Sequence, residues 1–335
     1  MKRTLVLLCV LFSTILFAQT DSTSVTVKSL DAKLTGYEYP YPVLYLILKE
    51  QKGVYNMAYM DVKPKNYNGR NVLLFHGKNF NGAYWKSTID TLTAQGYRVI
   101  APDQIGFGKS DKPENFQYSF AQLAQNTRAL LMTLEIEKTA VLGHSMGGML
   151  ATRFALMYPE VTDRLVLENP IGLEDYQAKI PYLNVDWWYQ NELNKDYAII
   201  KKYQKDNYYG GVWKADYDPY VNILAGWAQG KDKELIAWNN ALTYDMILTQ
   251  PVVHEFKDLK CPVLLIIGTR DRTAIGKALV KKEVKESMGQ YNKLGRETRT
   301  KIPNSKLVEI ENVGHIPHLE AFKKFMDPLL NFLAK

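Results

Sequence analysis

A single serine stands between two glycines at the junction of two sequence patterns. In the segment TAVLGHSMGGML (139–150), an apolar run leads to Gly143, Ser145 and Gly147, and a helix-like apolar pattern follows. A serine at a sharp strand-to-helix turn exposes its hydroxyl for nucleophilic attack, and flanking glycines avoid clashes with neighbouring backbone. The turn also places Met146 at the helix start, where a free backbone amide can stabilise a negative oxygen. The pattern therefore predicts a nucleophilic Ser145 and an oxyanion contact from the Met146 amide.

A serine hydroxyl needs a base, and the sequence contains five histidines. His315 follows the last apolar strand-like run, in the loop ENVGHIPHLE. A loop at this place can fold over the sheet edge toward Ser145, so His315 is the predicted general base. His318 lies one helical turn later and is expected to support the loop by hydrogen bonding. His144 is expected to point away from the nucleophile across the turn, and His254 is interpreted as a surface or packing residue.

Two acidic residues could orient the base and stabilise its charged form. Asp271 follows the apolar run PVLLIIG and lies on the loop after the penultimate strand. Glu168 ends the run RLVLE, the strand that follows the helix after Ser145. Both places can reach His315. Both give the chain order serine, acid, histidine. Asp271 is preferred, because G-x-x-D after an apolar strand is the commoner arrangement, and Glu168 remains the alternative acid.

A second oxyanion donor is expected on the loop that follows the strand-like run ending in LLFHG. The loop reads HGKNFNGAYW (76–85), and its natural donor is the backbone amide of Lys78. Together with the Met146 amide it would stabilise a tetrahedral oxyanion by roughly 3 kcal/mol per donor. The side chains of Lys78 and Asn79 are candidates for the pocket wall.

The elements that must position these residues can be read from alternating patterns. Apolar strand-like runs lie at 43–48, 71–75, 97–101, 139–143, 164–168, 262–268 and 306–310. Amphipathic helix-like segments lie between most of them, including 83–95, 119–134 and 146–158. Continuous apolar runs are typical of strands covered on both faces, and their alternation with helices predicts a doubly wound, mostly parallel α/β sheet.

One long stretch interrupts this alternation. No strong strand-like run appears between Glu168 and Pro262, and helical patterns are visible at 189–204 and 232–248. Residues 173–250 contain five of the six tryptophans and ten tyrosines. Tyrosine and tryptophan combine apolar bulk with a polar group, which suits the wall of a partly hydrated cavity. The stretch is therefore predicted to be a helical insertion that caps the core.

The N-terminus has the pattern of a secretory signal peptide. Lys2 and Arg3 precede an apolar run that ends before Ala18, a plausible cleavage point. Removal of residues 1–18 leaves Cys261 as the single cysteine, which excludes an internal disulfide, and lowers the formal charge from +7 to +5. We expect a periplasmic or secreted protein with no span in the membrane after cleavage. The basic stretch 277–301 alternates charge signs, which is typical of a solvated face rather than of a nucleic-acid site.

The motifs in this order resemble the α/β-hydrolase superfamily over about residues 45–335. The matching blocks are HG (76–77), APDQIGFGKSDKP (101–113), GHSMGG (143–148), GTRD (268–271) and VGHIPHLE (313–320). The resemblance implies a triad of Ser145, Asp271 and His315, an oxyanion hole at Lys78 and Met146, and a helical cap. The expected domains are a signal peptide (1–18), a hydrolase core (19–171 and 256–335) and the cap (172–255).

These observations predict an exported serine hydrolase that cleaves a carboxylic ester through an acyl-enzyme. Superfamily dehalogenases and epoxide hydrolases use an aspartate nucleophile, so Ser145 argues against both activities. Two alternatives remain within the fold: hydrolysis of an amide, as in prolyl aminopeptidases, or of a C–C bond. A non-catalytic ligand-binding homologue is the third alternative. We expect a monomer with a small acyl substrate, no nucleic-acid partner, no cofactor and no metal.

Overall fold

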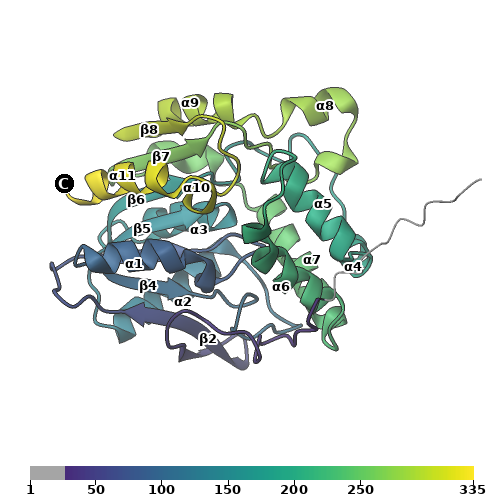
Figure 1. Cartoon of the computed structure of the whole chain (residues 1–335), viewed down its shortest axis with the longest axis horizontal. Coiled ribbons are helices and arrows are strands. Elements are labelled where there is room, and N and C mark those ends of the chain that lie inside the picture. Colours follow the sequence, from purple (N-terminus) through teal and green to yellow (C-terminus); the bar gives the residue numbers. More distant parts are fainter. Residues whose placement is uncertain (1–26) are drawn as a thin grey trace, which may run out of the picture.

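A single mixed sheet forms the centre of the molecule. The computed structural model describes residues 27–335, and its eight strands are ordered β1-β2-β4-β3-β5-β6-β7-β8 (Figure 1). The strands are β1 (Leu44–Glu50), β2 (Gly53–Val62), β3 (Asn71–Phe75), β4 (Arg98–Pro102), β5 (Thr139–His144), β6 (Thr162–Glu168), β7 (Val263–Gly268) and β8 (Ser305–Ile310). Strand β2 is antiparallel to both of its neighbours, and the pairs from β4 to β8 are parallel. The predicted mostly parallel α/β sheet is confirmed.

Strand β2 is the one strand that the apolar runs did not indicate. It pairs with β1 through a tight turn in which Gln51 and Lys52 have φ angles of 46° and 63°. Two consecutive positive φ angles are typical of a hairpin turn, where Asn-Gly is the usual signal. The Gln-Lys pair carries no such signal, so the sequence did not reveal the hairpin.

Helices cover both faces of the sheet (Figure 1). They are α1 (Lys86–Ala94), α2 (Phe120–Thr133), α3 (Met146–Met157), α9 (Tyr291–Lys301), α10 (Pro317–Glu320) and α11 (Phe322–Leu333). The short helix α8 (Lys282–Ser287) lies beyond the end of the sheet (Figure 1). Alternate strand residues point to opposite faces. Leu74 therefore packs in the cluster that contains residues of α1 and α11, and Phe75 packs with residues of α2 and α3. Every residue of β5 and β7 is buried, as expected for strands covered on both sides.

Between β6 and β7 the chain is helical and contains no strand. This part comprises α4 (Val185–Leu193), α5 (Tyr197–Asn207), α6 (Asp218–Ala228) and α7 (Lys233–Thr249). The helical pattern at 232–248 corresponds to α7, whereas the pattern at 189–204 is divided between two helices. Asp196 immediately precedes α5, and its side chain accepts a hydrogen bond from the Ile199 amide. This capping bond fixes where the second helix starts. Figure 1 shows these four helices together at one end of the sheet.

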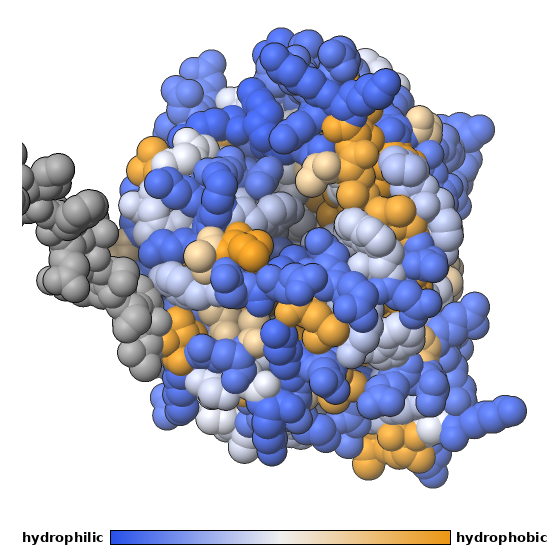
Figure 2. All heavy atoms as spheres, turned by 90° about the vertical axis from the view of Figure 1, so that its right-hand side faces the viewer, coloured by the Kyte–Doolittle hydropathy of each residue, from blue (hydrophilic) through white to orange (hydrophobic). Residues whose placement is uncertain are grey.

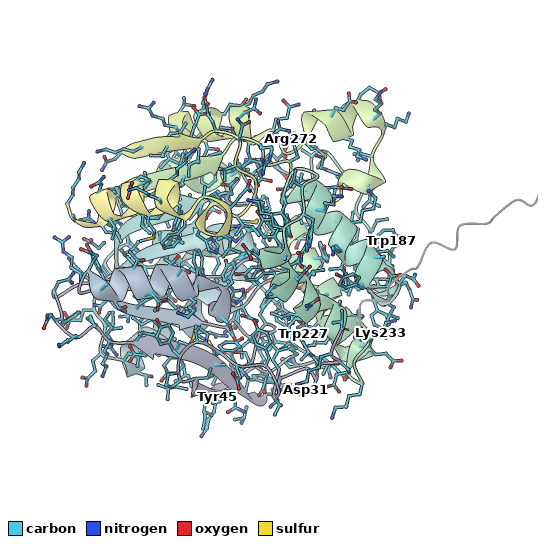
Figure 3. All side chains as sticks on the ribbon, in the orientation of Figure 1. Asp31, Tyr45, Trp187, Trp227, Lys233 and Arg272 are labelled. Atoms are coloured by element: carbon cyan, nitrogen blue, oxygen red, sulfur yellow. The ribbon has the colours of Figure 1, made fainter. Side chains whose placement is uncertain are left out.

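The first described segment ties the helical insertion to the core. Leu34 is fully buried against Trp227 and its neighbours on α6, and the Trp227 indole donates to the backbone carbonyl of Asp31 at 2.9 Å. Figure 3 labels Asp31 and Trp227 in the same region. A few residues later, the Tyr39 hydroxyl donates to the buried Asp103 carboxylate at 2.6 Å. Asp103 thus fixes this segment as well as its own loop.

The predicted signal peptide, residues 1–18, lies outside the described residues. Within residues 27–335, none of the helices combines the length and apolar character needed to cross a membrane.

Candidate active site

Ser145 occupies a strained turn at the carboxyl end of β5. Its φ angle is 57° and its ψ angle is −123°, and α3 begins at the next residue. A Cβ atom at Gly143 would lie 2.1 Å from the carbonyl oxygen of Gly147, and one at Gly147 would lie 2.3 Å from that of Phe75. Only glycine fits at either place. The close approach of backbone on both sides explains the spacing of the motif and holds the serine in a backbone conformation rare for residues other than glycine.

The structure brings Ser145, His315 and Asp271 together in one chain of hydrogen bonds. The Ser145 Oγ lies 2.9 Å from His315 Nε2, and His315 Nδ1 lies 2.6 Å from Asp271 Oδ2. His315 and Asp271 are fully buried and Ser145 is 6% exposed. A carboxylate accepts only, so Nδ1 carries the ring proton and Nε2 is left to accept from the serine hydroxyl. This is the arrangement that general-base activation of a serine requires.

Two neutral donors hold the Asp271 carboxylate in place. The Asn169 side-chain amide donates to Oδ2 at 2.8 Å, and the Thr273 backbone amide donates to Oδ1 at 2.7 Å. Asn169 in turn accepts from the Gly268 amide at 2.8 Å and has a φ angle of 34°. The sequence analysis missed Asn169. It could have been proposed from the sequence, because Asn169 directly follows an apolar strand-like run, and asparagine tolerates the left-handed backbone region better than most residues.

Glu168, the alternative acid, is not brought to His315. Its carboxylate accepts from the His318 backbone amide at 2.8 Å and from His318 Nδ1 at 2.9 Å. The His318 ring stacks on Trp85, with ring centroids 4.2 Å apart. Within residues 27–335, His318 Nε2 has no hydrogen-bond partner. Glu168 meets Ser145 through the backbone, where its carbonyl accepts from the Ser145 amide at 3.2 Å, while its carboxylate is bonded to His318. The structure thus contains two buried carboxylate–histidine pairs, of which one reaches the serine.

His144 holds the loop that carries His315. Its Nε2 lies 2.8 Å from the His315 carbonyl oxygen, and its Nδ1 lies 3.0 Å from the Tyr84 hydroxyl. A carbonyl can only accept, so Nε2 donates and Nδ1 accepts from the tyrosine. Burial and the neighbouring rings of His315 and His318 lower the pKa of His144 well below its usual value, which keeps it neutral. Both ring nitrogens are thus bonded to residues other than Ser145, and the sequence did not reveal this supporting role.

The backbone amides of the two expected oxyanion donors are both without an acceptor in the described part of the chain. Lys78 follows the turn after β3, and Met146 is the first residue of α3. The preceding turn is fixed by the Gly77 amide, which donates to the Tyr84 hydroxyl at 3.1 Å. Free amides at a helix start and on an adjacent turn can bind a negative oxygen.

The residue that directly follows α5, Tyr208, contacts the loop that carries His315. The Tyr208 ring lies against the His315 ring, with centroids 4.7 Å apart and an interplanar angle of 26°. The His315 amide donates to the Tyr208 carbonyl at 2.9 Å, and the Tyr208 hydroxyl accepts from the Asn79 side chain at 2.8 Å. The end of α5, within the helical insertion, is therefore in direct contact with His315.

His254 and Cys261, which the sequence analysis also considered, lie outside the hydrogen-bonded chain of Ser145, His315 and Asp271. His254 is exposed and pairs with Asp175 at 2.9 Å. The buried Cys261 thiol has a pKa raised to about 11 by burial, which makes it a poor nucleophile. Among residues 27–335, no group of three or more His, Cys, Asp or Glu side chains could hold a metal ion.

Comparison with known proteins identifies the family of the chain. The family model described as alpha/beta hydrolase fold matches residues 70–322, so the chain belongs to the alpha/beta hydrolase family. The crystal structure of a probable hydrolytic enzyme from Pseudomonas aeruginosa is similar, with 50% identity, a TM-score of 0.90, and coverage of 91% of this chain and 98% of that one.

Curated relatives are more distant or cover less of the chain. Lipase 1 of Psychrobacter immobilis is 28% identical over 270 residues, which are 78% of this chain and 76% of the lipase. An uncharacterized protein of Mycobacterium tuberculosis is 42% identical over 105 residues, 31% of this chain and 30% of that protein. The chain thus spans less than a third of the length of this mycobacterial relative. The named relatives support a hydrolase.

Proposed function

We propose that the protein is a serine hydrolase that cleaves carboxylic esters through an acyl-enzyme. The observation that carries the proposal is the hydrogen-bonded chain from Ser145 through His315 to Asp271, with distances of 2.9 and 2.6 Å. The similarity to a lipase over most of the chain supports the choice of an ester.

In the proposed first step, the Ser145 oxygen attacks the ester carbonyl carbon while His315 Nε2 takes the hydroxyl proton. The negative oxygen that forms accepts hydrogen bonds from the Lys78 and Met146 amides. Asp271 stabilises the charged imidazolium. The C–O bond then breaks, and the leaving alcohol takes the proton from Nε2, which leaves an ester between Ser145 and the acyl group.

A water molecule completes the cycle by the same route. His315 removes its proton, the water oxygen attacks the acyl carbon, and the serine leaves with the proton. The carboxylic acid is released and the free hydroxyl is restored. Because each proton passes through one ring nitrogen, loss of the ring or of its orientation affects both halves of the reaction.

The test uses a fluorophosphonate probe, which labels activated serines, on wild type, Ser145→Ala and Ser87→Ala. Ser87 is an exposed serine at the start of α1 and serves as the matched control. We expect labelling of wild type and of Ser87→Ala, and none of Ser145→Ala. A panel of p-nitrophenyl esters from acetate to palmitate, with an aminoacyl anilide alongside, then distinguishes ester from amide cleavage. Equal labelling of all three proteins would refute the nucleophile.

We also propose that the protein is exported after removal of residues 1–18, on the basis of the basic and apolar pattern of the N-terminus. Intact-mass measurement of protein purified from an export-competent host tests this. A mature chain that begins near Gln19 supports export, and a full-length chain contradicts it.

A further inference from the structure

A cavity among the inserted helices lies next to the turn that carries Lys78. Its volume is about 120 Å³, several times the roughly 10–15 Å³ that one water molecule needs. Residues of all four helices α4–α7 border it, together with Asn79. Two wall residues, Trp227 and Lys233, are labelled in Figure 3, and Figure 2 faces this side of the molecule, where hydrophilic and hydrophobic residues are interspersed. The Asn79 side chain donates to the Tyr208 hydroxyl at 2.8 Å, and the Tyr208 ring stacks on His315, so one wall residue of the cavity is linked directly to the proposed catalytic site.

One wall residue presents unpaired polar atoms. The Gln204 side chain of α5 is fully buried, and within residues 27–335 neither its Oε1 nor its Nε2 has a hydrogen-bond partner. An unpaired buried amide destabilises a fold, so such groups are rare unless something else pairs with them. A glutamine that borders a cavity, with its side-chain oxygen and nitrogen both unpaired, indicates a polar ligand.

The buried Lys78 side chain contacts two residues of the same cavity wall. Its Nζ donates to Asn240 Oδ1 at 3.2 Å and lies 4.0 Å from the Tyr244 ring centroid, and both neighbours are wall residues. No carboxylate of the described chain is within salt-bridge distance. Burial lowers the pKa of Lys78 to about 7, and the charge of Glu192 opposes this only in part. An ammonium group with one neutral acceptor has further donors to offer.

The charge balance of the cavity is positive. Glu192 is the acidic wall residue, and it is already paired with Lys195 and accepts from the Asn240 amide. Lys233 also borders the cavity, and in the part of the chain that the structure describes it forms no salt bridge. Lys233 on the wall and Lys78, which contacts the wall residues Asn240 and Tyr244, are thus two lysines without a salt bridge in the described chain.

We propose that this cavity binds a carboxylate of the substrate, so that the enzyme acts on anionic esters such as half-esters of short dicarboxylic acids. Lys78 and Gln204 are the binding residues. This specificity rests on the proposed esterase function. A carboxylate would supply the charge partner that Lys78 lacks, and a second oxygen or a bound water could pair with the Gln204 amide.

The test compares two p-nitrophenyl esters of equal shape. One is the half-ester of glutarate, and in the other an isopropyl group replaces the free carboxylate. We expect wild type to favour the anionic ester in kcat/KM. Lys78→Met should lower the ratio of the two kcat/KM values by roughly tenfold to a hundredfold, as for loss of a charge-assisted hydrogen bond, and Gln204→Leu should lower it less. Lys202→Met, which alters an exposed lysine of α5, is the control and should leave the ratio unchanged.

A binding measurement separates this inference from the proposed function. Glutarate itself should raise the Tm of wild type and of Ser145→Ala, and raise that of Lys78→Met and Gln204→Leu less. If neither ester is hydrolysed but glutarate still stabilises wild type, the esterase proposal fails and the carboxylate site stands. If both esters are hydrolysed equally and glutarate leaves the Tm unchanged, the carboxylate site is refuted and the esterase stands.

Discussion

The two buried carboxylate–histidine pairs allow a direct test of which carboxylate supports the activation of Ser145. Asp271→Asn and Glu168→Gln each remove one negative charge from a fully buried site and keep nearly the same shape. Each original carboxylate bonds a histidine Nδ1, at 2.6 Å to His315 and at 2.9 Å to His318. The two substitutions therefore differ chiefly in which histidine loses its partner.

Asp271→Asn should be the more damaging change for activity. The carboxylate accepts from three donors, and an amide oxygen cannot replace both of its oxygens. If the amide keeps the bond from Thr273, its NH₂ group faces His315 Nδ1 and moves the ring proton to Nε2, which can then no longer accept from Ser145. In either orientation the imidazolium loses its counter-charge. We expect kcat to fall about 10³- to 10⁴-fold, or roughly 4–5.5 kcal/mol at ~1.36 kcal/mol per decade.

Glu168→Gln should mainly lower stability. The His318 amide donates to Oε1 at 2.8 Å, and Nδ1 lies 2.9 Å from Oε1 and 3.0 Å from Oε2. A glutamine oxygen at Oε1 can keep the first two bonds, and the third is lost. We expect a loss of about 1–2 kcal/mol in the free energy of unfolding, as for weakened hydrogen bonds to a charged group, and a change in kcat of less than about tenfold, because His318 does not touch the serine.

The assays are kcat with an activated ester and urea unfolding followed by fluorescence. Fluorophosphonate labelling rates give a second measure of serine activation that does not depend on substrate binding. A fall in kcat for Glu168→Gln as large as that for Asp271→Asn, at unchanged stability, would overturn the assignment of the acid. So would an Asp271→Asn variant that keeps most of its activity.

Two further outcomes are expected. A Cβ atom at Gly314 would lie 1.9 Å from the Tyr208 carbonyl oxygen, so Gly314→Ala should displace the His315 loop and lower kcat about a hundredfold, with the fold retained by circular dichroism; full activity would contradict the positioning role. Burial lowers the pKa of Lys112 from 10.5 to about 7. The unfolded chain therefore binds a proton that the folded chain has lost above pH 7, and wild type should gain stability relative to Lys112→Met as pH rises from 7 to 9, by up to ~1.36 kcal/mol per pH unit. Urea unfolding at several pH values measures the difference, and a constant difference would contradict the shift.

Apolar runs were sufficient to predict the parallel part of the sheet. Strands buried on both faces must be apolar throughout, and β5 and β7 meet this condition at every position. Strand β2 lies near the edge and has exposed or half-buried positions at both ends, so its sequence mixes polar and apolar residues. The helical insertion was recognisable by its lack of strand runs. The break between α4 and α5 was not, because one capping aspartate decides it.

Local motifs indicated the serine, while the acid needed three-dimensional information. The constraints at Ser145 are local, since Gly143 and Gly147 clash with nearby backbone if they carry a Cβ atom. The choice between Asp271 and Glu168 depends on how two loops cross beyond adjacent strands, and chain order alone left both in reach. The packing of His318 on Trp85, far away in the sequence, decides which imidazole Glu168 meets.

The helical insertion is hydrogen-bonded to His315, the proposed base. This bond limits which inserted helices can move to admit substrate. The His315 amide bonds the Tyr208 carbonyl at 2.9 Å, and the two rings stack. Tyr208 directly follows α5, whose Gln204 borders the cavity. A rigid outward movement of α5 would therefore break a bond to the base itself. Opening that leaves the base in position must come from α4, α6 or α7, which bear no such bond to His315. A ligand that fills the cavity and pairs with Gln204 would hold α5, and with it His315, in the arrangement that the proposed reaction uses.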